Sequence, residues 1–246
     1  MTRVSPQLDT LPPAQRQLWP KLSAVGTDFV LYGGTALSLQ VGGRISIDFD
    51  FFSPYPLNLE DLPKKFEFLT HASLRRSAAN TAIFSLGDGG DSITVSFFGG
   101  LTFGRVGEPV IFSDNGVYGA ALLDLAAQEI KVVQQRAEAE DYLDIHRLLS
   151  CGVSLPTMLG AAIALFPDLN AAISLKALSY FGDVARVPEQ VKRDLIQAVA
   201  AVRDIPTISV VDKSILAVGL AIPKPWSLDD FVPPTLSSHK DPELER

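Results

Sequence analysis

The stretch from residue 28 to residue 52 constrains the fold of this chain more than any other segment. It reads as an apolar strand over 28–32, two glycines, a short helix, and a second apolar strand over 45–52. The second strand carries Asp48 and Asp50, which are separated by a single phenylalanine. Because side chains alternate between the two faces of a strand, both carboxylates point to the same face. Like charges this close repel each other unless a positive group lies between them, so the pattern predicts a cation site on one face of a sheet.

The two glycines, Gly33 and Gly34, precede a helix that we expect over residues 36–41, with Thr35 placed to cap it. A helix N-terminus offers free backbone N–H groups, and glycine lets an anion approach the backbone closely. An anion site beside paired carboxylates suits Mg²⁺ that is shared between protein and substrate phosphates. The sequence has neither the G-x-G-x-x-G pattern of dinucleotide sites nor the G-K-[ST] pattern of P-loops.

The rest of the chain divides into a mixed half and a helical half. Before residue 120 we expect helices at 14–25 and 58–70 and strands at 73–78, 81–86, 92–98 and 110–112. After it we expect helices at 121–137, 141–149, 155–165, 169–181 and 188–203. We therefore predict an α+β fold with a mixed twisted sheet in a core over 1–119. A helical region over 120–222 should pack on this core, and the proline-, serine- and charge-rich residues 223–246 should form a loose tail.

Composition sets the class of protein. The chain has 246 residues, of which 47% are hydrophobic and 20% charged, enough for a sizeable core in one or two domains. The formal net charge of −7 gives no general attraction for nucleic acid or an anionic membrane. Cys151 is the single cysteine, residues 1–20 lack a signal-peptide pattern, and the apolar run 205–222 is interrupted by Pro206 and Asp212. We therefore expect a cytoplasmic protein without a membrane span.

The motifs resemble those of a known fold when they are taken in order along the chain. The first block is Gly33-Gly34-Thr35-Ala36-Leu37, followed by Arg44, Ser46, Asp48 and Asp50 with Phe51-Phe52. A second block follows downstream, with Asp124-Leu125-Ala126-Ala127, Arg136 and Asp141-Tyr142-Leu143-Asp144. Together they resemble the nucleotidyltransferase fold and, more narrowly, the AbiEii/AbiGii toxin family of bacterial toxin–antitoxin systems. The resemblance covers about residues 28 to 190.

This resemblance implies a function and a set of site residues. It implies Mg²⁺-dependent transfer of a nucleotide from an NTP to an RNA acceptor, often tRNA, or to a protein acceptor, under the control of a cognate antitoxin. The implied catalytic residues are Asp48, Asp50 and Asp141. The implied phosphate- and nucleotide-binding residues are Gly33, Gly34, Thr35, Arg44, Ser46 and Arg136. The implied metal ligands are Asp48 and Asp50, with Glu129 as a candidate third.

Three positions depart from the pattern of the family. Ser96 stands on the strand where a third carboxylate is usual, and a hydroxyl is a poor Mg²⁺ ligand. Glu129 stands where the family has its active-site lysine, and Glu140 where a basic residue is usual. Lys131 is close by, but two residues along a helix turn it by about 200°, so we expect a solvated lysine there and Glu129 in the cleft. These changes remove positive charge from a site for a triphosphate.

Two interpretations of the site remain open at this stage. In the first, Asp48 and Asp50 bind metal, Glu129 replaces the third carboxylate, and Arg136 binds phosphate. In the second, Glu129 and Arg136 pair with each other, and the chain is a catalytically degenerate protein that binds a nucleotide or a partner.

Overall fold

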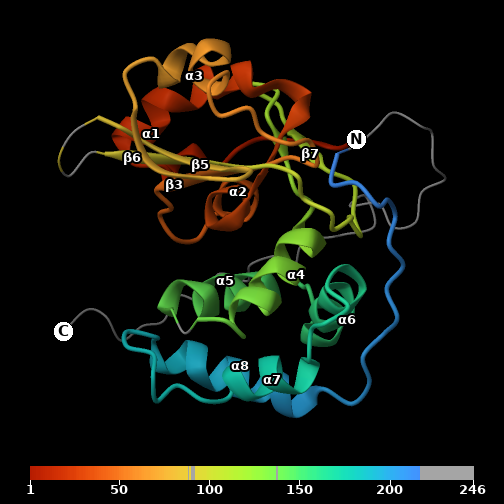
Figure 1. Ribbon diagram of the computed structural model, residues 1–246. Coiled ribbons are helices and arrows are strands. Elements are labelled where there is room, and N and C mark those ends of the chain that lie inside the picture. The colour runs from red at the N-terminus through yellow and green to blue at the C-terminus, as the bar shows by residue number, and fades with distance from the viewer. Residues whose placement is uncertain (88, 90–91, 137, 217–246) are drawn as a thin grey trace, which may run out of the picture.

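The computed structural model describes residues 1–87, 89, 92–136 and 138–216. Figure 1 shows two layers, a sheet with its own short helices and a group of helices that lies along one side of it. The sheet ends at Gly119, and the first helix of the second layer begins at Leu122. The predicted loose tail over 223–246 lies outside the described residues.

The sheet has eight strands in the order β1-β7-β8-β2-β3-β6-β5-β4. The strands are β1 Arg3–Val4, β2 Val30–Tyr32, β3 Asp48–Phe52, β4 Ser73–Ala78, β5 Thr81–Leu86, β6 Ile93–Phe98, β7 Val110–Phe112 and β8 Tyr118–Gly119. Strand β3 runs antiparallel to β2 and parallel to β6, so the sheet is mixed, as predicted. Its place inside the sheet puts the two aspartates on a strand that is paired on both sides.

The α-helices of the sheet layer are α1 Pro13–Leu18, α2 Gly33–Val41 and α3 Leu62–Lys65. Those of the second layer are α4 Leu122–Val132, α5 Ala139–Ser150, α6 Leu155–Leu165, α7 Ala171–Ala177 and α8 Glu189–Ala201. In Figure 1, α1 and α3 lie on one side of the sheet, whereas α2 lies on the side that faces α4 and α5. The α+β class and the helical second half are confirmed.

Four predicted helices are clearly shorter than the spacing suggested, among them the one expected over 121–137, which is α4 and ends at Val132. The helix expected over 14–25 continues after α1 as 3₁₀ structure over Trp19–Asp28, where Pro20 lacks the N–H that an α-helix needs. The helix expected over 58–70 is reduced to α3 and a 3₁₀ turn over Glu67–Leu69. The helix expected over 169–181 is α7 alone, and the side chain of Asn170 caps it by accepting a hydrogen bond from the backbone N–H of Ala172.

The register of β3 follows from its apolar residues. Phe49 and Phe51 are completely buried on the face opposite the two aspartates. Phe49 stacks on Trp19 with ring centroids 6.2 Å apart, and Phe51 stacks on Phe97 at 5.6 Å. Burying each phenylalanine stabilises the fold by about 1.5–3 kcal/mol. A slip of one residue would turn the aspartates into this core, so the core itself directs both carboxylates to the other face.

One observation bears on membranes. Among the residues that the structure describes, no single helix is long and apolar enough to span a bilayer, and the one pair that passes together, α5 with α6, is bent by 117°.

Candidate active site

The paired aspartates lie beside the glycine turn, as predicted. A Cβ atom added at Gly33 would lie 3.1 Å from Oδ2 of Asp50, so the carboxylate lies close beside the turn. Gly33 has a φ of +72°, a left-handed conformation that favours glycine. Asp48 is exposed and Asp50 is partly buried on the same face of β3. The turn thus brings the N-terminus of α2 and both carboxylates to one place.

The charge of Asp50 is poorly compensated by its surroundings. Burial raises the pKa of Asp50 to about 6, and the neighbouring charge of Asp48 acts in the same direction. The side chain of Ser96 and the charge of Arg136 lower this pKa, but they do not offset burial. A cation placed next to such a carboxylate stabilises its charged form.

Ser96 lies directly opposite Asp50 on β6, at the position predicted for the missing third carboxylate. Within the described part of the chain, no three His, Cys, Asp or Glu side chains are grouped so that they could hold a metal ion. The role of Glu129 as a third metal ligand beside Asp48 and Asp50 stays a prediction. Two carboxylates on one face still fit Mg²⁺, which commonly takes its remaining ligands from water and substrate phosphates.

Arg44 covers the second glycine of the turn. A Cβ atom at Gly34 would overlap Nη2 of Arg44, which explains the absence of a side chain at this position. The guanidinium forms a bidentate pair with Asp144, with distances of 2.9 Å from Nε to Oδ1 and 2.6 Å from Nη2 to Oδ2. Glu140 adds a third contact, 3.2 Å from Nη1. Arg44, a predicted nucleotide-binding residue, is thus shared between the anion site and two carboxylates.

Arg136, like Arg44, is paired with two carboxylates. Its Nη2 and Nε donate to the carboxylate of Asp141 at 2.9 and 3.2 Å, and its Nη1 lies 3.3 Å from Glu138. The Asp141 carboxylate is buried, whereas the Arg136 side chain is 53% exposed. The predicted pair between Arg136 and Glu129 is wrong, because Arg136 uses Asp141 and Glu138 instead. Asp141 contacts Arg136, which in turn lies close enough to Asp50 to lower its pKa.

Glu129 is buried among charges of both signs. Burial raises its pKa well above the ordinary value, and the charges of Asp144 and Asp141 add to this effect. Arg44 and Arg136 lower the same pKa to a smaller extent. The buried carboxyl therefore lies near both arginines and near Asp141 and Asp144. Its predicted direction into the cleft of Asp48 and Asp50 stays a prediction.

Thr35 and Ser46 connect the elements of the turn. The predicted cap at Thr35 is wrong, because α2 already begins at Gly33 and Thr35 lies within it. The Thr35 hydroxyl donates to the backbone carbonyl of Asp48 and lies 2.7 Å from Oγ of Ser46. Both hydroxyls are buried, so in this arrangement they join α2 to the start of β3.

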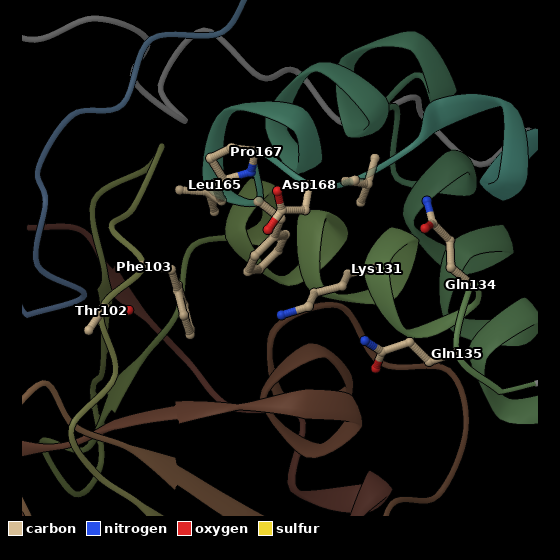
Figure 2. A pocket seen from close by; sticks show the side chains of 10 residues that line it. Thr102, Phe103, Lys131, Gln134, Gln135, Leu165, Pro167 and Asp168 are labelled. Carbon is tan, nitrogen blue, oxygen red and sulfur yellow. The ribbon is translucent and has the colours of Figure 1, made fainter.

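Lys131 lies in a pocket on another side of α4. Its ammonium group stands 4.1 Å from the ring centroid of Phe166, and Figure 2 shows it directed toward Phe103. Lys131 is partly exposed, so the prediction of a solvated lysine holds in part. The end of α6 brings the Phe166 ring beneath it, and partly buried lysines favour aromatic faces. Lys131 and Glu129 were predicted to point in different directions from α4. Their neighbours differ accordingly, because Lys131 lies on Phe166 and Glu129 lies near Arg44 and Arg136.

Sequence reasoning missed two participants of this region. Asp144 was visible only as the second acid of Asp141-Tyr142-Leu143-Asp144, and nothing local indicated that it binds Arg44, one hundred residues earlier. Phe103 stands in an irregular segment without any helical or strand pattern, yet its ring contacts Tyr32 and Phe52, each at 6.2 Å between centroids. Both contacts are long-range, so only the folded chain reveals them.

Comparisons with known proteins agree on the fold. An uncharacterized protein from Aquifex aeolicus (strain VF5) is 28% identical over 186 residues, which cover 74% of this chain and 86% of the relative. A putative nucleotidyltransferase from H. pylori superposes with a TM-score of 0.50 at 16% identity, over 76% of this chain and 92% of that one. MenT4, a nucleotidyltransferase toxin from Mycobacterium tuberculosis H37Rv, gives a TM-score of 0.54 at 16% identity, over 77% and 82%.

The match to a protein family is more extensive than the resemblance of single motifs. Residues 18–207 match the family described as the nucleotidyl transferase AbiEii toxin of type IV toxin–antitoxin systems. The matched range begins before β2 and ends after α8, so it includes the turn, the paired aspartates and both arginine pairs. The chain belongs to the AbiEii nucleotidyl transferase toxin family.

Proposed function

We propose that this protein transfers a nucleotide from an NTP to an acceptor and uses Mg²⁺ to do so. The observation that carries the proposal is the close approach of the Asp50 carboxylate to Gly33, with Asp48 on the same face of β3. It brings a cation site and a helix N-terminus within reach of one triphosphate.

Asp48 and Asp50 would hold the metal, which would offset the charge of the triphosphate. The poorly compensated charge of Asp50 supports this assignment, because its pKa of about 6 indicates a carboxylate without sufficient positive charge nearby. Mg²⁺ commonly takes several of its ligands from water and substrate, so two carboxylates would suffice to hold it.

The reaction forms a bond between an acceptor hydroxyl oxygen and the α-phosphorus of the NTP. The bond from the α-phosphorus to the bridging oxygen of the β-phosphate breaks, pyrophosphate leaves, and the proton of the hydroxyl is released to solvent. We assign Arg136 to the phosphates, because its half-exposed guanidinium lies near Asp50. Asp141 then acts as a positioning residue that holds Arg136. Arg44 binds phosphate at Gly34 and gives up part of its present contacts with Asp144 and Glu140 to do so.

The acceptor would approach along the sheet. Asp50 is paired with Ser96 on β6, and Ser96 with Ile83 on β5. Ile83 in turn is paired with Arg76 on β4, an edge strand whose six residues are all exposed. Paired residues share a face, so Arg76 lies three strands from Asp50, or roughly 14 Å. This arginine supports an RNA acceptor, such as tRNA, ahead of a protein acceptor.

A second candidate function is nucleotide or partner binding without turnover. It is favoured by the carboxylates that already pair with both arginines, and by the glutamate at position 129 in place of a lysine. The toxin family also implies a cognate antitoxin, which is the natural partner for a protein of either kind.

Transfer of a radioactive α-phosphate separates the two candidates. The protein would be incubated with Mg²⁺ and each labelled NTP in turn, with RNA or with protein supplied as the acceptor. We expect label on RNA with the unaltered chain and none with Asp48→Asn. Asp28→Asn, at an exposed aspartate paired with Lys65 outside the site, is the matched control and should retain transfer. NTP binding without label on any acceptor would favour the second candidate.

A further inference from the structure

A cavity of about 390 Å³ lies where the loop after β6 meets the C-terminal part of α4 and the end of α6. Phe103 and Thr102 contribute to it from the loop, Lys131 and Gln135 from the α4 side, and Phe166 and Asp168 from the end of α6. Its volume falls within the range of small-molecule sites, about 300–1,000 Å³. The nucleotide chemistry described above uses none of these side chains.

The lining combines aromatic surface with polar ends. The rings of Phe103 and Phe166 are 5.4 Å apart and inclined by 59°. Phe166 is already covered by the ammonium of Lys131, whereas Phe103 is only partly buried. In Figure 2 the ends of Lys131 and Gln135 are directed toward the space beside Phe103. Gln134 points away, in agreement with its hydrogen bonds to Asn170 and Ser174.

A row of aromatic rings connects this cavity with Asp50. Tyr32 is paired with Asp50 in the sheet and stacks on Phe52 with ring centroids 4.6 Å apart. Phe103 contacts both rings. Phe52 lies two residues beyond Asp50 on the same face, about 7 Å along the strand. A flat ring bound against Phe103 would therefore lie on the same side of the sheet as phosphates bound at Asp50.

We propose that this cavity binds the base of the NTP, stacked on Phe103, with its edge toward Lys131 and Gln135. The inference rests on the proposed function and adds the part of the substrate that it left unassigned. Aromatic side chains stack on every base, so Phe103 supplies affinity without choosing among the four. Gln135 both donates and accepts, so it adapts to any edge.

Lys131 supplies the preference among the four bases. An ammonium group donates hydrogen bonds and accepts none, so it favours a base edge with a carbonyl oxygen, which is a stronger acceptor than the ring nitrogens of adenine. Guanine, cytosine and uracil each have such an oxygen, and adenine has none. The cavity therefore favours GTP, CTP and UTP over ATP.

Binding measurements with two probes test this assignment. Titration calorimetry would compare each Mg²⁺–NTP with Mg²⁺–tripolyphosphate, which has the phosphates without a base. The variants are Phe103→Leu, which keeps apolar volume but loses the aromatic face, Phe103→Trp, which restores such a face, and Lys131→Met. Lys176→Met, at an exposed lysine on α7, is the matched control for loss of a positive charge. Circular dichroism would verify that each variant is folded.

We expect every NTP to bind more tightly than tripolyphosphate, and ATP to be the weakest of the four. Phe103→Leu should weaken all four NTPs by about tenfold and leave tripolyphosphate unchanged, and Phe103→Trp should restore binding. Lys131→Met should remove the disadvantage of ATP, whereas Lys176→Met should not. Equal binding of NTP and tripolyphosphate, or NTP binding that is insensitive to Phe103→Leu, would overturn the base site and leave the proposed function intact. If neither the NTPs nor tripolyphosphate bound the unaltered protein, both the base site and the proposed function would be overturned.

Discussion

The Asp50 carboxylate lies directly beside Gly33, so that a Cβ atom at Gly33 would stand 3.1 Å from Oδ2 of Asp50. This close approach places the strand that carries the carboxylates next to the turn that opens α2. A side chain at Gly33 would push the carboxylate away from the helix N-terminus.

Gly33→Ala should therefore lower stability and weaken binding of Mg²⁺–NTP. Alanine at a φ of +72° costs about 1 kcal/mol from backbone strain alone. Gly26 has the same φ of +72°, and a Cβ atom added there would meet nothing within 4 Å, so Gly26→Ala is a control for alanine at a positive φ without a neighbouring carboxylate. Chemical denaturation and calorimetry should show a similar loss of stability in both variants, with weaker nucleotide binding only in Gly33→Ala. Equal nucleotide binding by the two variants would contradict a role for this close approach.

The charge of Asp50 predicts a dependence of stability on pH. Its pKa is raised to about 6 in the folded protein, against about 3.9 in an unfolded chain. A raised carboxyl pKa contributes stability that is fully present below about pH 4 and is lost as the pH rises through 6. Asp50→Asn should therefore stabilise the metal-free protein at pH 8 relative to pH 4, by on the order of 2 kcal/mol.

Denaturation of both proteins at the two pH values measures this difference. Asp48→Asn should produce a smaller change in the same direction, because the charge of Asp48 contributes to the raised pKa of Asp50. A difference between Asp50→Asn and the unaltered protein that does not vary with pH would show that the Asp50 carboxylate is already compensated.

The geometry around Asp50 was predictable because its causes are local. Alternation along a strand placed Asp48 and Asp50 on one face, and the buried phenylalanines between and after them fixed which face. The glycine turn could also be read locally, although the role of Thr35 could not. Its hydroxyl bonds to the backbone of a strand that begins thirteen residues later, which competes with capping.

The charge pairs were not predictable because their partners come from distant segments. Helix geometry gave the direction of Glu129 and Lys131 relative to each other. It could not show that α6 places Phe166 under Lys131, or that α5 presents Asp144 to Arg44. Pairing of Arg136 with Glu129 was plausible on one helix, but Asp141 offered a closer carboxylate at the start of the next helix.

The two acids that contact Arg44 should differ greatly in their effect on stability. Asp144 is buried and bidentate, whereas the Glu140 side chain is 63% exposed. Loss of one partner from a buried pair costs about 3–5 kcal/mol, and the partial exposure of Arg44 reduces this, so we expect about 2 kcal/mol for Asp144→Asn. Glu140→Gln should change the free energy of unfolding by less than about 0.5 kcal/mol. Urea denaturation tests both, and equal effects would mean that Asp144 is not the main partner.

Glu129 limits the positive charge that is available to phosphates. Glu129→Lys would place an ammonium beside Asp141 and Asp144, which now hold the two arginines. We expect this variant to bind Mg²⁺–NTP several-fold more tightly, and Glu129→Gln to have an intermediate affinity. The reason is that the carboxylates would then attract Arg44 and Arg136 less strongly, which leaves more of their positive charge for the phosphates. Calorimetric titration of the three proteins gives the order, and weaker binding by Glu129→Lys would contradict this account of the charges.

The most direct test of the whole account is the thermal stability of the protein with and without Mg²⁺–NTP, measured for the unaltered chain and for Asp48→Asn. A ligand that binds only the folded state at one hundred times its dissociation constant stabilises by about 2.7 kcal/mol. We expect a higher Tm for the unaltered protein with Mg²⁺–NTP. We expect no shift for Asp48→Asn, whose own Tm is unchanged or slightly raised because one of two crowded charges is gone. A shift that survives in Asp48→Asn, or no shift in the unaltered protein, would contradict a metal–nucleotide site at Asp48 and Asp50.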